Sequence, residues 1–76
     1  MKAKIYITLK PGVLDPQGKA VQQALSSLGV DEVQDVRVGK FIELNLSRNS
    51  EGRVKEMCEK LLANTVIESY RFEMEP

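Results

Sequence analysis

The first ten residues alternate between polar and apolar side chains, with the period of two that is typical of a β-strand with one buried face. The apolar positions are Ala3, Ile5, Ile7 and Leu9. Pro11 and Gly12 follow directly, and this pair is typical of a turn. We therefore expect a strand over residues 2–10 whose odd-numbered side chains face the core.

A helix is predicted after this turn. Asp15 is a favoured N-cap residue, and Pro16 is favoured at the first helical position. The apolar residues that follow with helical spacing are Val21, Ala24, Leu25 and Leu28. Gly29 then stands where a left-handed C-cap is favoured. We expect a helix over residues 16–28 whose apolar stripe packs against a sheet.

Two further strands are predicted in the middle of the chain. Residues 33–38 are rich in valine, and Gly39 and Lys40 separate them from an alternating run over residues 41–46. The apolar members of that run are Ile42, Leu44 and Leu46. Because only these two residues separate the two segments, the sequence predicts a β-hairpin.

The last third of the chain predicts a second helix and a fourth strand. The apolar residues of the helix follow i, i+3, i+4, i+7, i+8 spacing, and they are Val54, Met57, Cys58, Leu61 and Leu62. Asn64 is placed to cap this helix. Residues 66–74 then alternate again, with Tyr70, Phe72 and Met74 on one side. We expect both elements to bury their apolar sides.

The order of these elements, β-α-β-β-α-β, predicts an α+β two-layer sandwich. Because each crossover is right-handed, both helices are expected on one face of a mainly antiparallel four-stranded sheet. The other face stays bare, and it is expected to carry Tyr6, Thr8, Phe41, Glu43 and Asn45. This mixture suits either water or a partner. Since so small a core gains from association, a homo-oligomer is expected.

Composition and charge narrow the possible functions. The 76 residues include eleven basic and eleven acidic side chains, so no net charge attracts nucleic acid or anionic lipid. Histidine, the commonest general base and metal ligand, does not occur. The sequence has neither a glycine-rich phosphate loop nor an apolar run long enough to cross a bilayer. We expect one domain over residues 1–76 that binds neither nucleic acid nor a membrane.

The single cysteine, Cys58, cannot form an internal disulfide, which suits a reducing cytoplasm. It lies on the apolar stripe of the second predicted helix, and no histidine is present to activate it. A buried structural thiol is therefore expected. The acidic residues of this helix and of the last strand are interpreted as solvated charges and not as a catalytic pair.

Two segments are candidates for contact with a partner. Residues 9–19 place two apolar residues in a loop before a capped helix, which suits either a local hydrophobic staple or a docking or anion-binding point with flanking lysines. Residues 37–41 combine two cations with an aromatic, which suits either an interface centre or a solubilising turn. No catalytic, cofactor-binding or metal-ligating residue is assigned. The subunit-interface candidates are Tyr6, Lys10, Pro11, Gly12, Asp15, Gly18, Lys19, Arg37, Gly39, Lys40 and Phe41.

The chain resembles PurS, the small subunit of phosphoribosylformylglycinamidine (FGAM) synthase. Residues 9–20, 35–44, 57–64 and 66–68 carry the resemblance, which is collinear over nearly the whole chain. Gly52 stands where relatives tend to have Glu or Ala, and Thr65 where proline is frequent. Neither departure lies in a candidate contact segment.

The resemblance implies a place in de novo purine biosynthesis, in a carbon–nitrogen ligase that uses glutamine, ATP and formylglycinamide ribonucleotide. In that complex a glutaminase subunit releases ammonia, and a large synthetase subunit binds ATP, magnesium and the ribonucleotide. PurS-like subunits form homodimers that bridge the other two and aid ammonia transfer, while pairing of dimers into tetramers stays open. The resemblance implies a non-catalytic cytoplasmic subunit that binds no cofactor itself.

Other classes of protein share the predicted order of elements. The main alternative is a free-standing dimeric regulatory domain of ferredoxin-like shape that binds a small molecule, which ligand-induced thermal shifts would reveal. An RNA-recognition module needs stacking aromatics and a basic surface, and Phe41 with zero net charge does not supply them. An acylphosphate hydrolase would need an arginine-bearing phosphate loop after the first strand, and the sequence has none there.

Overall fold

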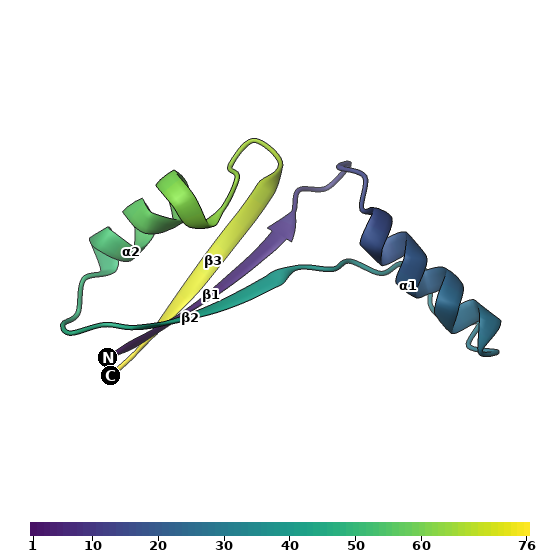
Figure 1. Cartoon of the computed structure of the whole chain (residues 1–76), viewed down its shortest axis with the longest axis horizontal. Coiled ribbons are helices and arrows are strands. Elements are labelled where there is room, and N and C mark those ends of the chain that lie inside the picture. Colours follow the sequence, from purple (N-terminus) through teal and green to yellow (C-terminus); the bar gives the residue numbers. More distant parts are fainter.

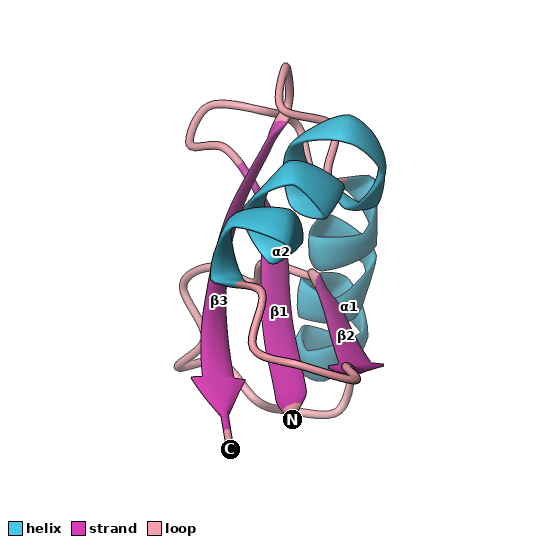
Figure 2. Ribbon diagram, turned by 90° about the vertical axis from the view of Figure 1, so that its left-hand side faces the viewer, coloured by secondary structure: helices cyan, strands magenta, loops and turns pink.

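Three strands form one antiparallel sheet in the computed structural model of the chain, which describes residues 1–76. The central strand, β1 (Lys2–Leu9), pairs with β2 (Lys40–Asn45) on one side and with β3 (Glu68–Glu75) on the other. Figure 2 shows the three strands in the order β3, β1, β2. The predicted alternation of β1 is confirmed, because Ala3, Ile5 and Ile7 are buried.

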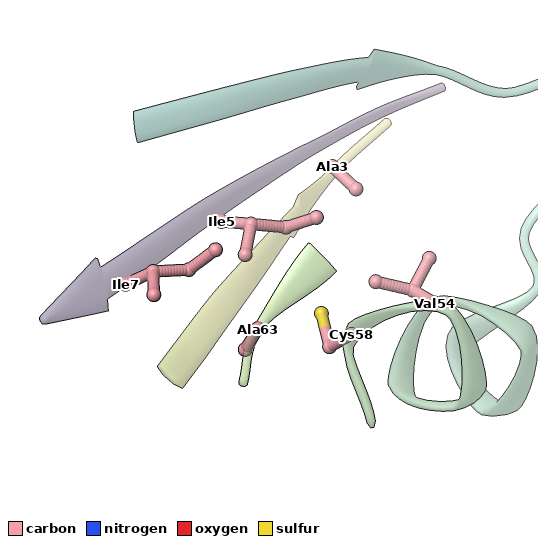
Figure 3. Close-up of a cluster of buried hydrophobic side chains, with 6 residues drawn as sticks. All are labelled: Ala3, Ile5, Ile7, Val54, Cys58 and Ala63. Atoms are coloured by element: carbon pink, nitrogen blue, oxygen red, sulfur yellow. The ribbon is translucent and has the colours of Figure 1, made fainter. Parts of the chain in front are cut away.

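The core lies between the sheet and the second helical region. Helix α2 (Glu51–Met57) continues into a π-helical turn, η1 (Cys58–Leu62). Figure 3 shows the buried side chains of this core, which are Ala3, Ile5, Ile7, Val54, Cys58 and Ala63. Each fully buried aliphatic side chain of this kind contributes about 1.5–3 kcal/mol. The core therefore depends on β1 and on α2 with η1.

The π-helical turn corrects one part of the predicted apolar stripe. Ala63 N–H donates to the Cys58 carbonyl over 2.9 Å, which is the i to i+5 bond of a π-helix. The wider turn rotates each residue less than an α-helix does. Leu62 is therefore half-buried, whereas Leu61, which was expected to face the core, is 81% exposed.

Helix α1 (Pro16–Ser27) does not cover the sheet, and the prediction that both helices lie on one sheet face is wrong for this helix. Figure 1 shows α1 beyond the end of the sheet, on the far side from α2. The apolar side chains of Val21, on α1, and of Leu28, its C-cap, are 42% and 79% exposed. The radius of gyration is 15.6 Å, well above the roughly 11 Å of a compact chain of this length.

The sheet has three strands, so the prediction of four strands with a central hairpin is not met within one chain. Residues 33–38 form no strand, because their polar main-chain groups meet α1 and the loop before it. The Gln22 amide donates to the Gln34 carbonyl over 3.0 Å, and Val38 N–H donates to the Asp15 carboxylate over 3.0 Å. No turn forms at Gly39, and β2 begins at Lys40.

No helix of the chain combines the length and the apolar character that crossing a membrane requires.

Candidate interaction site

The two segments predicted as contact sites meet at one end of the sheet, where α1 begins. The loop over residues 10–15 leaves the end of β1, and residues 36–39 lead past it into β2. Asp15 joins the two, because its carboxylate accepts from Gly18 N–H over 2.8 Å and from Val38 N–H over 3.0 Å. We call this junction the α1 root, and it comprises residues 10–19 and 36–40.

Asp15 is the buried acidic residue of the α1 root, with 7% of its surface exposed. The Val38 N–H, followed by the Gly18 N–H, holds the pKa of this carboxyl below its ordinary value, and nearby Arg37 acts in the same direction. Burial opposes this shift but does not cancel it. The carboxylate is therefore charged at neutral pH and serves as the N-cap of α1, as the sequence predicts.

Two glycines of the α1 root are required by close packing. A Cβ atom on Gly18 would overlap the Val36 carbonyl oxygen, and one on Gly39 would overlap the Ile7 carbonyl oxygen. The main chain at each position therefore lies directly against a neighbouring segment. These contacts fix where α1 leaves the sheet and how residues 36–39 enter β2.

Arg37 supports the same junction from outside. Its guanidinium donates to the carbonyls of Leu9 and Lys10, each over 3.1 Å, and of Val13 over 3.3 Å. A planar fork of N–H donors suits such a set of carbonyl oxygens. Arg37 was predicted as a contact residue for a partner, and in this structure its polar atoms bind the loop of its own chain.

The lysines of the α1 root differ in their surroundings. Lys40 forms an ion pair with Glu68 over 3.4 Å. Lys19 is exposed on the first turn of α1, and the Lys10 main chain donates to the Ile67 carbonyl over 2.8 Å. The anion-binding interpretation of the helix start loses its basis, because the Asp15 carboxylate already occupies the cap position.

A second group of candidates lies on the outer face of the sheet, away from the core. Tyr6 lies directly opposite Phe41 on β2 and Arg71 on β3. The ring centroids of Tyr6 and Phe41 are 5.1 Å apart, and the Arg71 guanidinium carbon lies 3.9 Å from the Tyr6 centroid. This row of three side chains in contact is exposed at Phe41 and Arg71. An aromatic row with an arginine is typical of protein interfaces.

The sequence analysis missed Arg71 and Glu68. The alternation of residues 66–74 does place Arg71 on the side opposite Tyr70 and Phe72. Its position over Tyr6, however, depends on the register between β1 and β3, which no local pattern contains. Glu68 accepts from Asn64 N–H over 2.6 Å, and this bond keeps the pKa of its carboxyl low beside Lys40.

The expected structural role of Cys58 agrees with its place in the core. The thiol is fully buried against β1, and burial raises its pKa. The structure contains no cluster of three or more metal-binding side chains (histidine, cysteine, aspartate or glutamate) that could hold a metal ion.

Comparison with known proteins identifies the family to which the chain belongs. Residues 2–76 match the family model described as PurS: Phosphoribosylformylglycinamidine (FGAM) synthase. The chain belongs to the PurS family. The PurS subunit of Bacillus subtilis is 61% identical over 77 residues, covering 97% of this chain and 92% of the relative. The PurS subunit of Synechocystis is 53% identical over 75 residues, covering 93% and 75%.

Solved PurS structures share the fold. The structure of B. subtilis PurS superposes with a TM-score of 0.90 at 60% identity, covering 99% of this chain and 98% of the other. A chain in the structure of PurLQS from Thermotoga maritima has a TM-score of 0.82 at 30% identity, covering 95% and 93%. The chain is thus a PurS subunit of FGAM synthase, an enzyme of purine biosynthesis.

Proposed function

We propose that this PurS subunit works as a homodimeric bridge, which holds the glutaminase and synthetase subunits of FGAM synthase together and aids ammonia transfer between them. The observation that carries the proposal is the similarity to a chain of the T. maritima PurLQS structure, over 95% of this chain. Holding the source of ammonia beside its consumer contributes by proximity, which replaces an encounter in solution by a step within one assembly.

The surfaces of the chain support a binding role. The α1 root is braced by Asp15 and Arg37, so its exposed side chains are presented from a fixed main chain. The outer face offers Tyr6, Phe41 and Arg71 as a row of side chains in contact. We propose that these two surfaces contact the other subunits, and that ATP and magnesium act in the large synthetase subunit and not on this chain.

The uncovered helix α1 supports self-association. Val21 on α1 and Leu28 at its C-cap are exposed. Half-buried side chains such as Ile42 and Phe72 border the core, on a sheet that a single helical region covers. A second copy that covers these apolar groups would remove them from water. We place the complex in the cytoplasm, since the one cysteine is a buried free thiol.

Assembly of the three purified subunits tests the bridge. Light scattering after size-exclusion chromatography should show a ternary complex when this chain is present, and separate glutaminase and synthetase when it is omitted. Phe41→Ala, which removes an exposed ring of the outer face, should weaken the complex, whereas Glu32→Ala, at an exposed acidic residue away from both surfaces, should not. A stable glutaminase–synthetase complex without this chain would refute the proposal.

A further inference from the structure

Two loops meet at the end of the sheet where β1 ends and β3 begins. The Lys10 N–H donates to the Ile67 carbonyl over 2.8 Å, and so joins the loop after β1 to the loop before β3. Figure 1 shows both loops at the same end of the sheet. We call residues 10–14 and 64–67 together the loop rim. Its first segment belongs to the α1 root, whereas its second segment lies outside both contact segments predicted from the sequence.

The loop rim exposes apolar side chains from both of its segments. Leu14 and Val66 are 73% and 80% exposed, and Ile67 next to Val66 is exposed as well. Pro11 adds a further exposed apolar side chain. Single exposed apolar residues are common on protein surfaces, but a group of them on adjoining loops is typical of an interaction surface.

Leu14 has no local packing role that would account for its place. It directly precedes the N-cap Asp15, where an apolar residue can pack against the fourth helical residue as a hydrophobic staple. The fourth residue of α1 is Lys19, and both Leu14 and Lys19 are exposed. The staple, one of the two interpretations of this segment from its sequence, is therefore not formed. The other interpretation, a docking point, remains.

Both segments of the loop rim are fixed by hydrogen bonds within the chain. The Arg37 guanidinium holds three carbonyls of the loop after β1. In the second segment the Asn64 carbonyl accepts from Ile67 N–H over 3.1 Å, and the Asn64 side-chain oxygen accepts from Val66 N–H over 3.1 Å. A surface that is held in place before binding loses less conformational entropy when it binds.

The charge of the loop rim is positive. Lys10 is its one charged residue, and Lys10 belongs to none of the ion pairs of the chain. The acidic residues that directly follow the two segments are engaged inside the chain. Asp15 is buried as the N-cap of α1, and Glu68 forms an ion pair with Lys40. Neither carboxylate therefore offsets Lys10 at the surface.

The border of the loop rim toward α1 is also more basic than acidic. A hollow next to Leu14 is lined by three exposed charged residues, of which Lys19 and Arg37 are basic and Asp35 is acidic. The apolar rim is thus surrounded by net positive exposed charge. A partner surface that complements it is apolar at its centre and acidic at its border.

We infer that the loop rim docks on such an apolar, acid-bordered surface of another subunit of FGAM synthase. The inference rests on the bridging role of the proposed function, and it adds residues 64–67 and the chemistry of the partner surface. Val66, Ile67 and Leu14 fill the apolar centre, and Lys10 meets the acidic border. A second copy of the chain is a poorer occupant, because its rim carries the same unpaired lysine and would repel the first.

Substitutions at Val66 in the full chain test the apolar centre. Val66→Ser should weaken binding to the glutaminase and synthetase subunits, supplied together, by about tenfold, because an exposed apolar anchor is lost. Val66→Ile keeps the position apolar, and its affinity should stay within about twofold of wild type. Sedimentation velocity over a series of concentrations measures the affinities. Since Val66 is exposed, the melting temperatures of both variants should match that of wild type.

Charge reversals test the chemistry of the partner. Lys10→Glu should weaken the same complex by about tenfold, because a glutamate would face the acidic border. Lys55→Glu is the matched control, since Lys55 is an exposed lysine of α2 outside the loop rim. This control should leave the affinity within about twofold of wild type.

The results separate the loop rim from the bridge itself. Failure of the wild-type chain to bind the other two subunits would refute the bridge and with it the rim. A wild-type complex that is unchanged by both Val66→Ser and Lys10→Glu would overturn the rim alone. A Lys10→Glu effect no larger than that of Lys55→Glu would overturn the acidic border. Variants that lose self-association but keep their affinity for the other subunits would place a second copy on the rim and overturn the inference.

Discussion

The Asp15 carboxylate accepts a 3.0 Å hydrogen bond from the Val38 N–H, and so joins the start of helix α1 to the segment that enters β2. Its other oxygen caps the helix through Gly18 N–H. One side chain therefore sets the direction in which α1 leaves the sheet. Figure 1 shows α1 beyond the end of the sheet, reached by the segment after β1 and left by the segment before β2.

Asp15→Ala should lower the melting temperature by about 4–8 °C, because it removes the N-cap of α1 and leaves Val38 N–H without its acceptor. Asp31→Ala is the matched control, since Asp31 is an exposed aspartate outside the helices and strands. Differential scanning calorimetry of both variants measures the effect. Equal melting temperatures for the two would contradict the structural role of Asp15.

The same carboxylate predicts an acid-sensitive stability. The pKa of Asp15 is lower in the folded chain than its ordinary value near 3.8, chiefly because of the Val38 N–H. A group with a depressed folded pKa stabilises above its unfolded pKa, and this contribution is lost as the pH falls through the folded pKa. Denaturant titrations should therefore show the advantage of wild type over Asp15→Asn shrinking below about pH 4. An advantage unchanged down to pH 2 would disprove the assignment.

Two glycine substitutions should act in opposite directions. Gly18→Ala places a Cβ on the Val36 carbonyl and should destabilise the chain by more than about 1 kcal/mol. Gly52→Ala, in α2 with open space around it, should stabilise by about 0.5–1 kcal/mol, because alanine loses less conformational entropy in a helix. Urea unfolding of both measures the free energies. A Gly18→Ala chain as stable as wild type would show that Gly18 is not tightly packed.

Cys58 should be unreactive until the chain unfolds, because its thiol is fully buried and its pKa is raised. Cys58→Ser should cost about 1–3 kcal/mol by placing a hydroxyl without an evident partner in the apolar core, and Cys58→Val, which stays apolar, should cost less. Thiol labelling with and without denaturant, together with calorimetry, checks both statements. Rapid labelling of the native chain would place Cys58 at the surface.

Local sequence patterns predicted the elements better than their arrangement. The alternation of β1, the Asp15 cap and the stripe through Val54 and Cys58 all appear in the structure, because each depends on neighbours a few residues away. The position of α1 depends instead on the contact between Gly18 and Val36, which are 18 residues apart. A helical pattern shows that an apolar stripe tends to be buried, but it does not show which surface packs against it.

The candidate site shows the same division. The sequence pointed to the segments around Asp15 and Arg37, and the structure brings them together at the α1 root. It did not reveal that Arg37 binds the carbonyls of the loop after β1, because those groups are more than 20 residues away in the sequence. Nor did it reveal that Arg71 covers Tyr6, which follows from the register between β1 and β3.

The bridging role itself is tested most directly by measuring FGAM formation by the glutaminase and synthetase subunits, with glutamine or with ammonium chloride as nitrogen donor, with and without this chain. The account predicts that omitting the chain lowers the rate of the glutamine-dependent reaction at least tenfold. The rate of the ammonia-dependent reaction should stay within about twofold of its value with the chain present. A glutamine-dependent rate that is unchanged without the chain would contradict it.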